Sequence, residues 1–163
     1  MLQSRTSDQE QRLVAERLVK YTGTARVKLE FLHFPNEPRE LNLKNVERLK
    51  KCFQTEGCYR LVLENRIPAI IDASQLNDAL QASGILATEL LSHPKEGYPE
   101  LKFPAGYQLT CLHGRHRIQA GREVLARRNA WWAVDLYLAG MDIFWRATRA
   151  SSDVTFCRQQ QRA

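Results

Sequence analysis

The residues best suited to chemistry lie in one stretch, Tyr107–Arg128, which reads YQLTCLHGRHRIQAGREVLARR. Alternating apolar residues before Gly114 predict a short strand, and the pattern after it predicts a helix. Arg115, His116 and Arg117 then fall in the first helical turn, where unpaired backbone N–H groups and the helix dipole favour an anion. Because cations there are unfavourable without an anion, the stretch predicts a phosphate site.

Composition fits such a site without locating it. The chain has 163 residues, 44% of them hydrophobic, and a net charge of +6, which predicts one globular domain with a core. A basic balance favours nucleotides, nucleic acid or an acidic surface as partners, although an ordinary basic surface gives the same charge. No apolar run approaches the roughly 18 residues of a membrane span, so we expect an intracellular protein of the cytoplasm or nucleus.

The cysteines and histidines do not predict a metal site. The four cysteines have no CxxC spacing and are expected to be free thiols: Cys52, Cys58, Cys111 and Cys157. Cys111, His113 and His116 span a strand-to-helix turn with no carboxylate nearby, which is a poor ligand set. The sequence also lacks a Walker loop, G-x-S-x-G and HExxH.

The first part of the chain predicts a helix, a strand and a second helix. Ser7–Glu10 reads SDQE, a capping box that would begin a helix ending near Gly23. Arg26–Phe34 has the period of two of a half-buried strand. Asn42 can cap a second helix that ends near Gly57. Its apolar face would comprise Val46, Leu49 and Phe53.

The middle of the chain predicts two short strands, Arg60–Glu64 and Ile67–Asp72. Their core residues would be Leu61, Leu63, Ile70 and Ile71. Ser74–Ser92 has a helical pattern that Gly84 kinks or breaks. The Pro- and Gly-containing segment His93–Tyr107 is then a loop, which serves either as a lid or only as packing.

A final strand is predicted over Ala130–Ala139, and it begins with Trp131 and Trp132. Adjacent strand residues face opposite ways, so one tryptophan should be buried and the other should lie on the second face, covering an apolar patch or stacking on a base. Together the elements predict an α/β (α+β) fold. Three parts are expected: a helical extension (1–23), a domain (24–139) with an insertion at 74–106, and a basic tail (140–163).

Two motifs in this order resemble a known family. FPNEPR (Phe34–Arg39), followed by LKNVERLKK, and then LHGRHRIQA (Leu112–Ala120) are similar to the two halves of the ParB/sulfiredoxin superfamily N-terminal domain, over about residues 26–139. The tryptophan pair before VDLYL resembles fungal members most. The resemblance implies a small mixed sheet flanked by helices, and a pocket for a nucleoside triphosphate, with or without Mg²⁺.

The resemblance also implies roles for single residues. Gly114 would permit close backbone approach, and Arg117 would be the main phosphate cation. The other implied roles are auxiliary phosphate contacts for Arg115 and His116, helix–sheet packing for Ala120, and entry into the pocket from the first loop for Arg39. A guanidinium fork suits phosphate oxygens.

Departures from the family pattern narrow the chemistry. Sulfiredoxins place a catalytic cysteine directly after the motif glycine, where this chain has Arg115, so reductase chemistry is not expected. Chromosome-partitioning relatives use Gly-Glu-Arg-Arg and a following helix-turn-helix domain, for which the segment after Ala139 is expected to be too short. Related small-molecule kinases carry Gly-x-His-Arg, which leaves phosphoryl transfer open, with Glu37 or Glu40 as base.

Two other functions remain open from the sequence. A nucleic-acid-binding module would use the basic helix over residues 115–128 against backbone phosphates, with Arg122, Arg127 and Arg128 joining Arg115 and Arg117. A degenerate or truncated chain would act only as an interaction protein. The sequence therefore predicts an anionic partner and leaves open whether a reaction follows.

Overall fold

The computed structural model describes residues 3–35, 40–92 and 97–139. It forms a five-stranded mixed sheet of order β1-β5-β3-β4-β2, flanked by helices, which confirms the predicted mixed α/β class. The strands are β1 (Tyr21–Lys28), β2 (Leu32–His33), β3 (Ile67–Ile71), β4 (Leu109–Cys111) and β5 (Trp131–Leu138). The α-helices are α1 (Gln3–Lys20), α2 (Leu43–Thr55), α3 (Ala73–Ser83) and α4 (Arg115–Val124). The 3-10 turns are η1 (Leu29–Phe31), η2 (Leu63–Asn65), η3 (Ala87–Leu90) and η4 (Arg127–Asn129).

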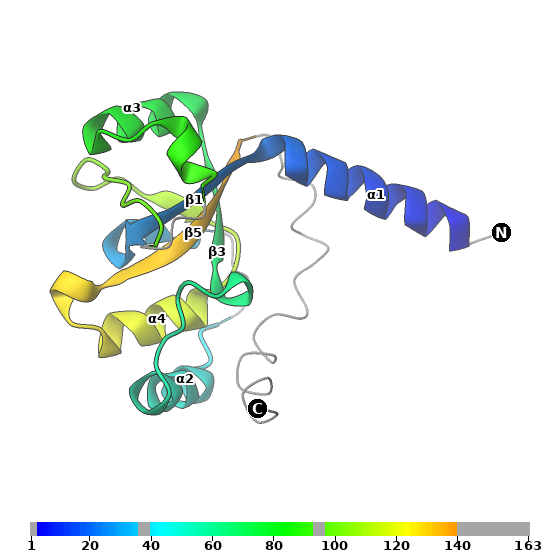
Figure 1. Ribbon diagram of the computed structural model, residues 1–163. Coiled ribbons are helices and arrows are strands. Elements are labelled where there is room, and N and C mark those ends of the chain that lie inside the picture. Colours follow the sequence, from blue (N-terminus) through cyan, green and yellow to red (C-terminus); the bar gives the residue numbers. More distant parts are fainter. Residues whose placement is uncertain (1–2, 36–39, 93–96, 140–163) are drawn as a thin grey trace.

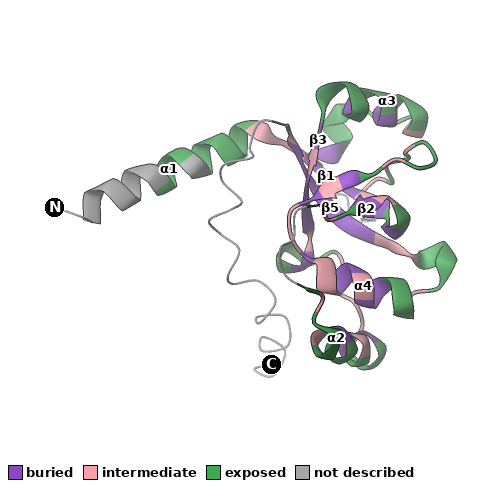
Figure 2. Ribbon diagram, turned by 180° about the vertical axis from the view of Figure 1, so that it is seen from behind, coloured by how far each residue is buried: buried purple, intermediate pink, exposed green. Residues whose placement is uncertain are grey.

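Helices α2 and α4 lie on one side of the sheet and α3 lies on the other, while α1 projects away from the sheet (Figure 1). Strand β5 is paired on both sides, antiparallel to β1 and parallel to β3. It is buried along most of its length, as Figure 2 shows for the centre of the sheet. The core therefore surrounds β5.

The two tryptophans of β5 divide as predicted. Trp132 is fully buried, its ring centroid lies 5.6 Å from that of Phe53 on α2, and its Nε1 donates to the Asn65 carbonyl at 2.7 Å. Trp131 is half-buried on the other face, where the Arg60 guanidinium carbon lies 3.8 Å from its ring centroid. Because Trp132 contacts α2 from the central strand, it holds that helix layer to the sheet.

Helix α2 also matches its prediction. The Asn42 side chain accepts from the Asn45 N–H, and the helix ends at Thr55, two residues before Gly57. The predicted apolar residues Val46, Leu49 and Phe53 are buried. The period of 3.6 was a sufficient signal here because this helix has one buried and one exposed face.

Two predictions for the first 34 residues are wrong. Helix α1 begins at Gln3, before the predicted capping box, and ends at Lys20, so Gly23 lies inside β1. A Cβ on Gly23 would overlap Leu90, so this glycine serves a close approach and ends no helix. The single strand predicted over Arg26–Phe34 is broken by η1, whose Leu29 carbonyl accepts from the Arg122 side chain at 3.0 Å.

The strand predicted over Arg60–Glu64 is also wrong. This segment is a turn followed by η2, and Leu61 and Leu63 are 45% and 65% exposed. Arg60 Nη1 donates to the carbonyls of Asn129 and Trp131, at 2.7 and 2.9 Å, which ties the turn to the start of β5. These side-chain bonds replace strand pairing, and the apolar residues of the segment face solvent.

The next segments agree better with the sequence. Strand β3 ends at Ile71, where Ile71 is buried and Ile70 half-buried. Helix α3 ends at Ser83 because Gly84 adopts a left-handed C-cap (φ +66°), so the predicted interruption is confirmed. After it, residues 99–101 bind the backbone of Arg26 through N–H···O bonds of 2.8 and 3.0 Å.

Gly114 joins β4 to α4 and has no room for a side chain. Its φ of +98° is left-handed, and a Cβ built on it would overlap Ile67 Cδ1 on β3. The left-handed φ and the contact with Ile67 each favour glycine, and together they determine that α4 begins directly after position 114.

We predict that Gly114→Ala destabilises the fold more than Gly106→Ala does. Gly106 also has positive φ (+81°), yet no described atom lies within 4 Å of its built Cβ, so this variant measures backbone strain alone. We expect roughly 1–2 kcal/mol for Gly106→Ala and about 1–3 kcal/mol more for Gly114→Ala, because Ile67 must shift. Urea unfolding of both variants measures the difference, and equal losses would contradict the packing role of Gly114.

A buried carboxylate links β1 to β5 on the face opposite α4. Thr24 Oγ1 donates to Asp135 Oδ1 at 2.5 Å, and Arg66 Nη1 lies 3.6 Å from the same oxygen. Burial raises the pKa of Asp135, and the Thr24 hydrogen bond and the Arg66 charge oppose that shift only in part. The ionised form is therefore less favourable in the folded chain than in the unfolded chain.

We predict that Asp135 weakens the fold as pH rises. A carboxyl whose pKa is raised by folding contributes stability below its unfolded pKa, and this contribution is lost as pH rises through the folded pKa. Asp135→Asn keeps an oxygen for Thr24 and cannot ionise. The unfolding free energy of the variant, minus that of the parent, should therefore increase from pH 3.5 to pH 7 in urea titrations. A difference that stays constant or decreases would contradict the assignment.

Candidate functional site

The first turn of α4 has the features that the sequence predicts for a phosphate site. Gly114 is its N-cap, so no side chain caps the turn, and the turn contains no acidic residue. Arg115 and His116 are half-buried at its start. Helix α2, by contrast, is capped by the Asn42 side chain. The N-terminus of α4, the positive end of the helix dipole, therefore has no carboxylate in its first turn to offset that charge.

A second segment lies against this turn. The backbone N–H of Asn42 donates to His116 Nε2 at 3.1 Å, so this nitrogen carries no proton in that contact. Asn42 follows the loop of the first family-like motif, Phe34–Arg39. It is 74 positions from His116 in the sequence. The structure thus brings the segment before α2 and the glycine turn together.

Arg117 lies beneath the turn. Its side chain is only 1% exposed, and Nη1 donates to the Glu64 carbonyl at 3.3 Å. A buried guanidinium needs such acceptors because its desolvation is costly. Direct contact with a phosphate would require its covering atoms to move, and its role as the main phosphate cation stays a prediction.

The packing of α4 depends on a residue that the sequence did not single out. Ala120 is fully buried, in keeping with its predicted place against the sheet. The helix also packs tightly at Gly121, where a Cβ would lie 3.3 Å from both Leu29 Cδ1 and Trp132 Cζ3. The adjacent small residues Ala120 and Gly121 could have predicted this contact from the sequence, since two small residues together in a helix indicate close packing.

The predicted loop contributes less to the described site. Glu37 and Arg39 lie outside the described residues, so their roles stay predictions. Glu40 is described and exposed, two residues before Asn42. Its role as base stays a prediction as well.

The cations predicted to extend the site along α4 are arranged differently. Arg122 Nη2 donates to the carbonyls of Leu29 and Leu32, at 3.0 and 2.7 Å, and holds η1 and β2 to the helix. Burial lowers the pKa of Arg122. Arg127 and Arg128 are exposed in η4, beyond the end of α4. Arg122, like Arg117, thus stabilises the main chain.

Cys52, Cys58 and Cys111 form no disulfide within the described residues. Burial raises the pKa of Cys111 to about 12, so this cysteine is a neutral thiol near pH 7 and a poor nucleophile. Cys157 lies outside the described residues. Within the described ranges, no group of three or more His, Cys, Asp or Glu side chains is placed to hold a metal ion.

No helix in the described part of the chain has the length and apolar character needed to cross a bilayer. This finding leaves the expected compartment a prediction.

No curated protein matches the chain. One similar solved structure is the C-terminally truncated chromosome-partitioning protein ParB from Caulobacter crescentus, complexed with CTP-gamma-S, at 13% identity and a TM-score of 0.38. The match covers 72% of this chain and 46% of that one, so the chain spans less than half of the ParB chain. The expected likeness to fungal proteins stays a prediction. Residues 20–152 match the family described as "Protein of unknown function (DUF3723) N-terminal domain", and the chain therefore belongs to this family.

Proposed function

We propose that this chain binds a nucleoside triphosphate, with its phosphates on the first turn of α4. One observation carries the proposal: the turn begins at a left-handed glycine, has no acidic residue, and presents Arg115 and His116 beside the segment at Asn42. Backbone N–H groups and the helix dipole then favour phosphate oxygens. The ParB/sulfiredoxin resemblance supports a nucleotide as the source of the phosphate.

Each residue has a distinct part in the proposed site. Arg115, half-buried at the rim, supplies a guanidinium fork to phosphate oxygens. His116 holds the Asn42 segment against the turn. Arg117 contributes positive charge from below, since its side chain is buried. Gly114 allows the turn to pack on Ile67. This packing is a reason for glycine at the position that does not involve a ligand.

The proposal also includes Mg²⁺ binding and a reaction of the nucleotide in which residues of the first loop take part. Mg²⁺ in such sites is held mostly by phosphate oxygens, water and one or two carboxylates. Arg39 is proposed to reach the phosphates from the first loop, and Glu37 or Glu40 is proposed as base for hydrolysis or phosphoryl transfer. The nucleic-acid alternative on α4 is less well supported, because Arg117 and Arg122 donate to main-chain carbonyls.

We predict that CTP, ATP or GTP binds with a 1:1 stoichiometry and that Arg115→Gln weakens this binding about tenfold or more, the loss expected for one charge-assisted hydrogen bond. Isothermal titration with each nucleotide, with and without Mg²⁺, measures the effect. Arg128→Gln is the matched control, since it removes the same charge from an exposed position beyond α4. A folded chain that gives no heat with any of the three nucleotides would refute the function.

We also predict that His116→Ala weakens nucleotide binding more than His116→Gln. Alanine removes the acceptor of the Asn42 N–H, whereas the glutamine side-chain oxygen can accept the same bond. His116 is thus a positioning residue as well as a phosphate contact. The titrations above, with thermal melts to compare folding, separate the two variants. Equal losses in both variants would show that the bond to Asn42 does not matter for the site.

A further inference from the structure

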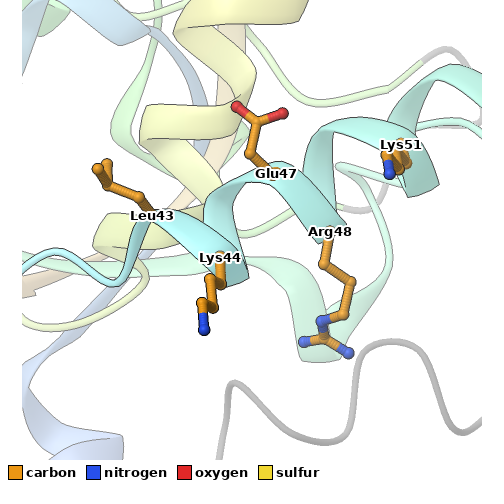
Figure 3. A pocket seen from close by; sticks show the side chains of 5 residues that line it. All are labelled: Leu43, Lys44, Glu47, Arg48 and Lys51. Carbon is orange, nitrogen blue, oxygen red and sulfur yellow. The ribbon is translucent and has the colours of Figure 1, made fainter.

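We propose that the exposed face of α2 binds the phosphate backbone of nucleic acid. This face carries three cations in a row, Lys44, Arg48 and Lys51, which we call the α2 cation stripe. Their spacing of four and three residues places them on one side of the helix, and all three are exposed. With Leu43 and Glu47 they line one shallow pocket (Figure 3).

The helix that carries the stripe is firmly anchored. Its opposite face buries Leu49 and Phe53, and the Phe53 ring contacts Trp132 of the central strand. Lys50 Nζ bridges α2 to α4 through a 2.8 Å ion pair with Glu123. The stripe is therefore a rigid surface, and binding would not require the helix to form.

An acidic residue of the same helix, Glu47, is paired with a cation outside the stripe. Glu47 lies on the same face and lines the same pocket. Figure 3 shows its carboxylate directed away from the side chains of Lys44 and Arg48, and its Oε1 pairs with Lys50 at 2.8 Å. Like charges at these spacings repel and disfavour the helix. An anionic partner along the stripe would remove that cost.

The geometry of the stripe fits a polymer of phosphates. From Lys44 to Lys51 the helix rises about 10 Å, close to the axial distance from the first to the last of four successive phosphates on one strand of a duplex, at about 3.4 Å per step. Arg48 is oriented by its neighbour, since its Nε and Nη2 donate to Asn45 Oδ1 at 3.3 and 2.8 Å.

An acidic peptide is a poorer match for this surface. Acidic peptide motifs are typically recognised by clusters of arginine, whereas two of the three stripe cations are lysines. Leu43, 68% exposed, is the single apolar side chain among the described residues that line the pocket. None of the described residues that line it has an aromatic ring for base stacking. We therefore infer contact with the backbone that ignores base sequence. This inference does not depend on nucleotide binding at α4.

The test compares two triple variants that lose the same charge. The first is Lys44→Gln, Arg48→Gln and Lys51→Gln, and the matched control is Lys28→Gln, Arg127→Gln and Arg128→Gln, which removes exposed cations near η4. Glutamine is a good helix former, so α2 should persist, and circular dichroism checks this. Fluorescence anisotropy with a labelled 20-base-pair DNA, at 50 and 200 mM salt, measures affinity.

We expect the affinity of the parent chain to depend on salt with a log–log slope of about −2.7, the value for three phosphate contacts at about 0.9 each. Affinity should then fall about 40-fold between the two salt concentrations. The first variant should lose at least tenfold in affinity at 50 mM and most of the slope, whereas the control should change by less than about twofold. Single-stranded RNA and poly-glutamate competitors identify the polymer.

Three results would overturn the proposal. These are no binding to DNA or RNA at 50 mM salt, equal losses in the two triple variants, and equal competition by poly-glutamate. Nucleotide titrations with the same first variant keep the two proposals distinct, because Arg115 and His116 are unchanged in it. Loss of polymer binding with nucleotide binding intact supports the α2 surface alone.

Discussion

The fold of the site depends on one close contact, between Gly114 and Ile67. Because any Cβ at position 114 would overlap the Ile67 side chain, and because φ is +98°, the chain must turn there and α4 must begin at Arg115. Each later residue then rotates by about 100° around the helix. Arg117 consequently lies in the interior, while Arg115 and His116 stay at the edge of the protein. The backbone conformation of Gly114 thus leaves two adjacent side chains, those of Arg115 and His116, half-buried, and buries the third, that of Arg117.

Several of the basic side chains of the domain stabilise its main chain. Arg122 donates to the carbonyls of Leu29 and Leu32, and Arg60 donates to those of Asn129 and Trp131. In each case one carbonyl lies in a 3-10 turn, Leu29 in η1 or Asn129 in η4, and the other lies at the start of the strand that follows it. A guanidinium can satisfy two such oxygens at once, which offsets part of its desolvation. A count of arginines along α4 therefore overstates the charge that it offers to a ligand.

This use of arginine also explains which elements could be predicted from the sequence. The helix with Val46, Leu49 and Phe53 and the strand with Trp131 and Trp132 each bury one face, and periodicity reports that directly. The segments Arg26–Phe34 and Arg60–Glu64 alternate like strands, but bonds from distant arginines turn their backbones. Such long-range bonds leave no trace in a local pattern. The position of the glycine turn was predictable, whereas the burial of Arg117 was not, because it depends on the Glu64 carbonyl.

Two kinds of anion site follow from where the remaining charge lies. At α4 the charge converges on one helix end, which suits a single compact group of phosphates. On α2 it is spread along the helix, which suits a chain of phosphates and makes affinity depend on salt. Asn42 joins the two, since its side chain caps α2 while its N–H binds His116. Substitution of Asn42 by alanine would remove the side-chain cap of α2 and keep the backbone N–H that donates to His116, whereas a substitution at His116 removes only the contact at α4.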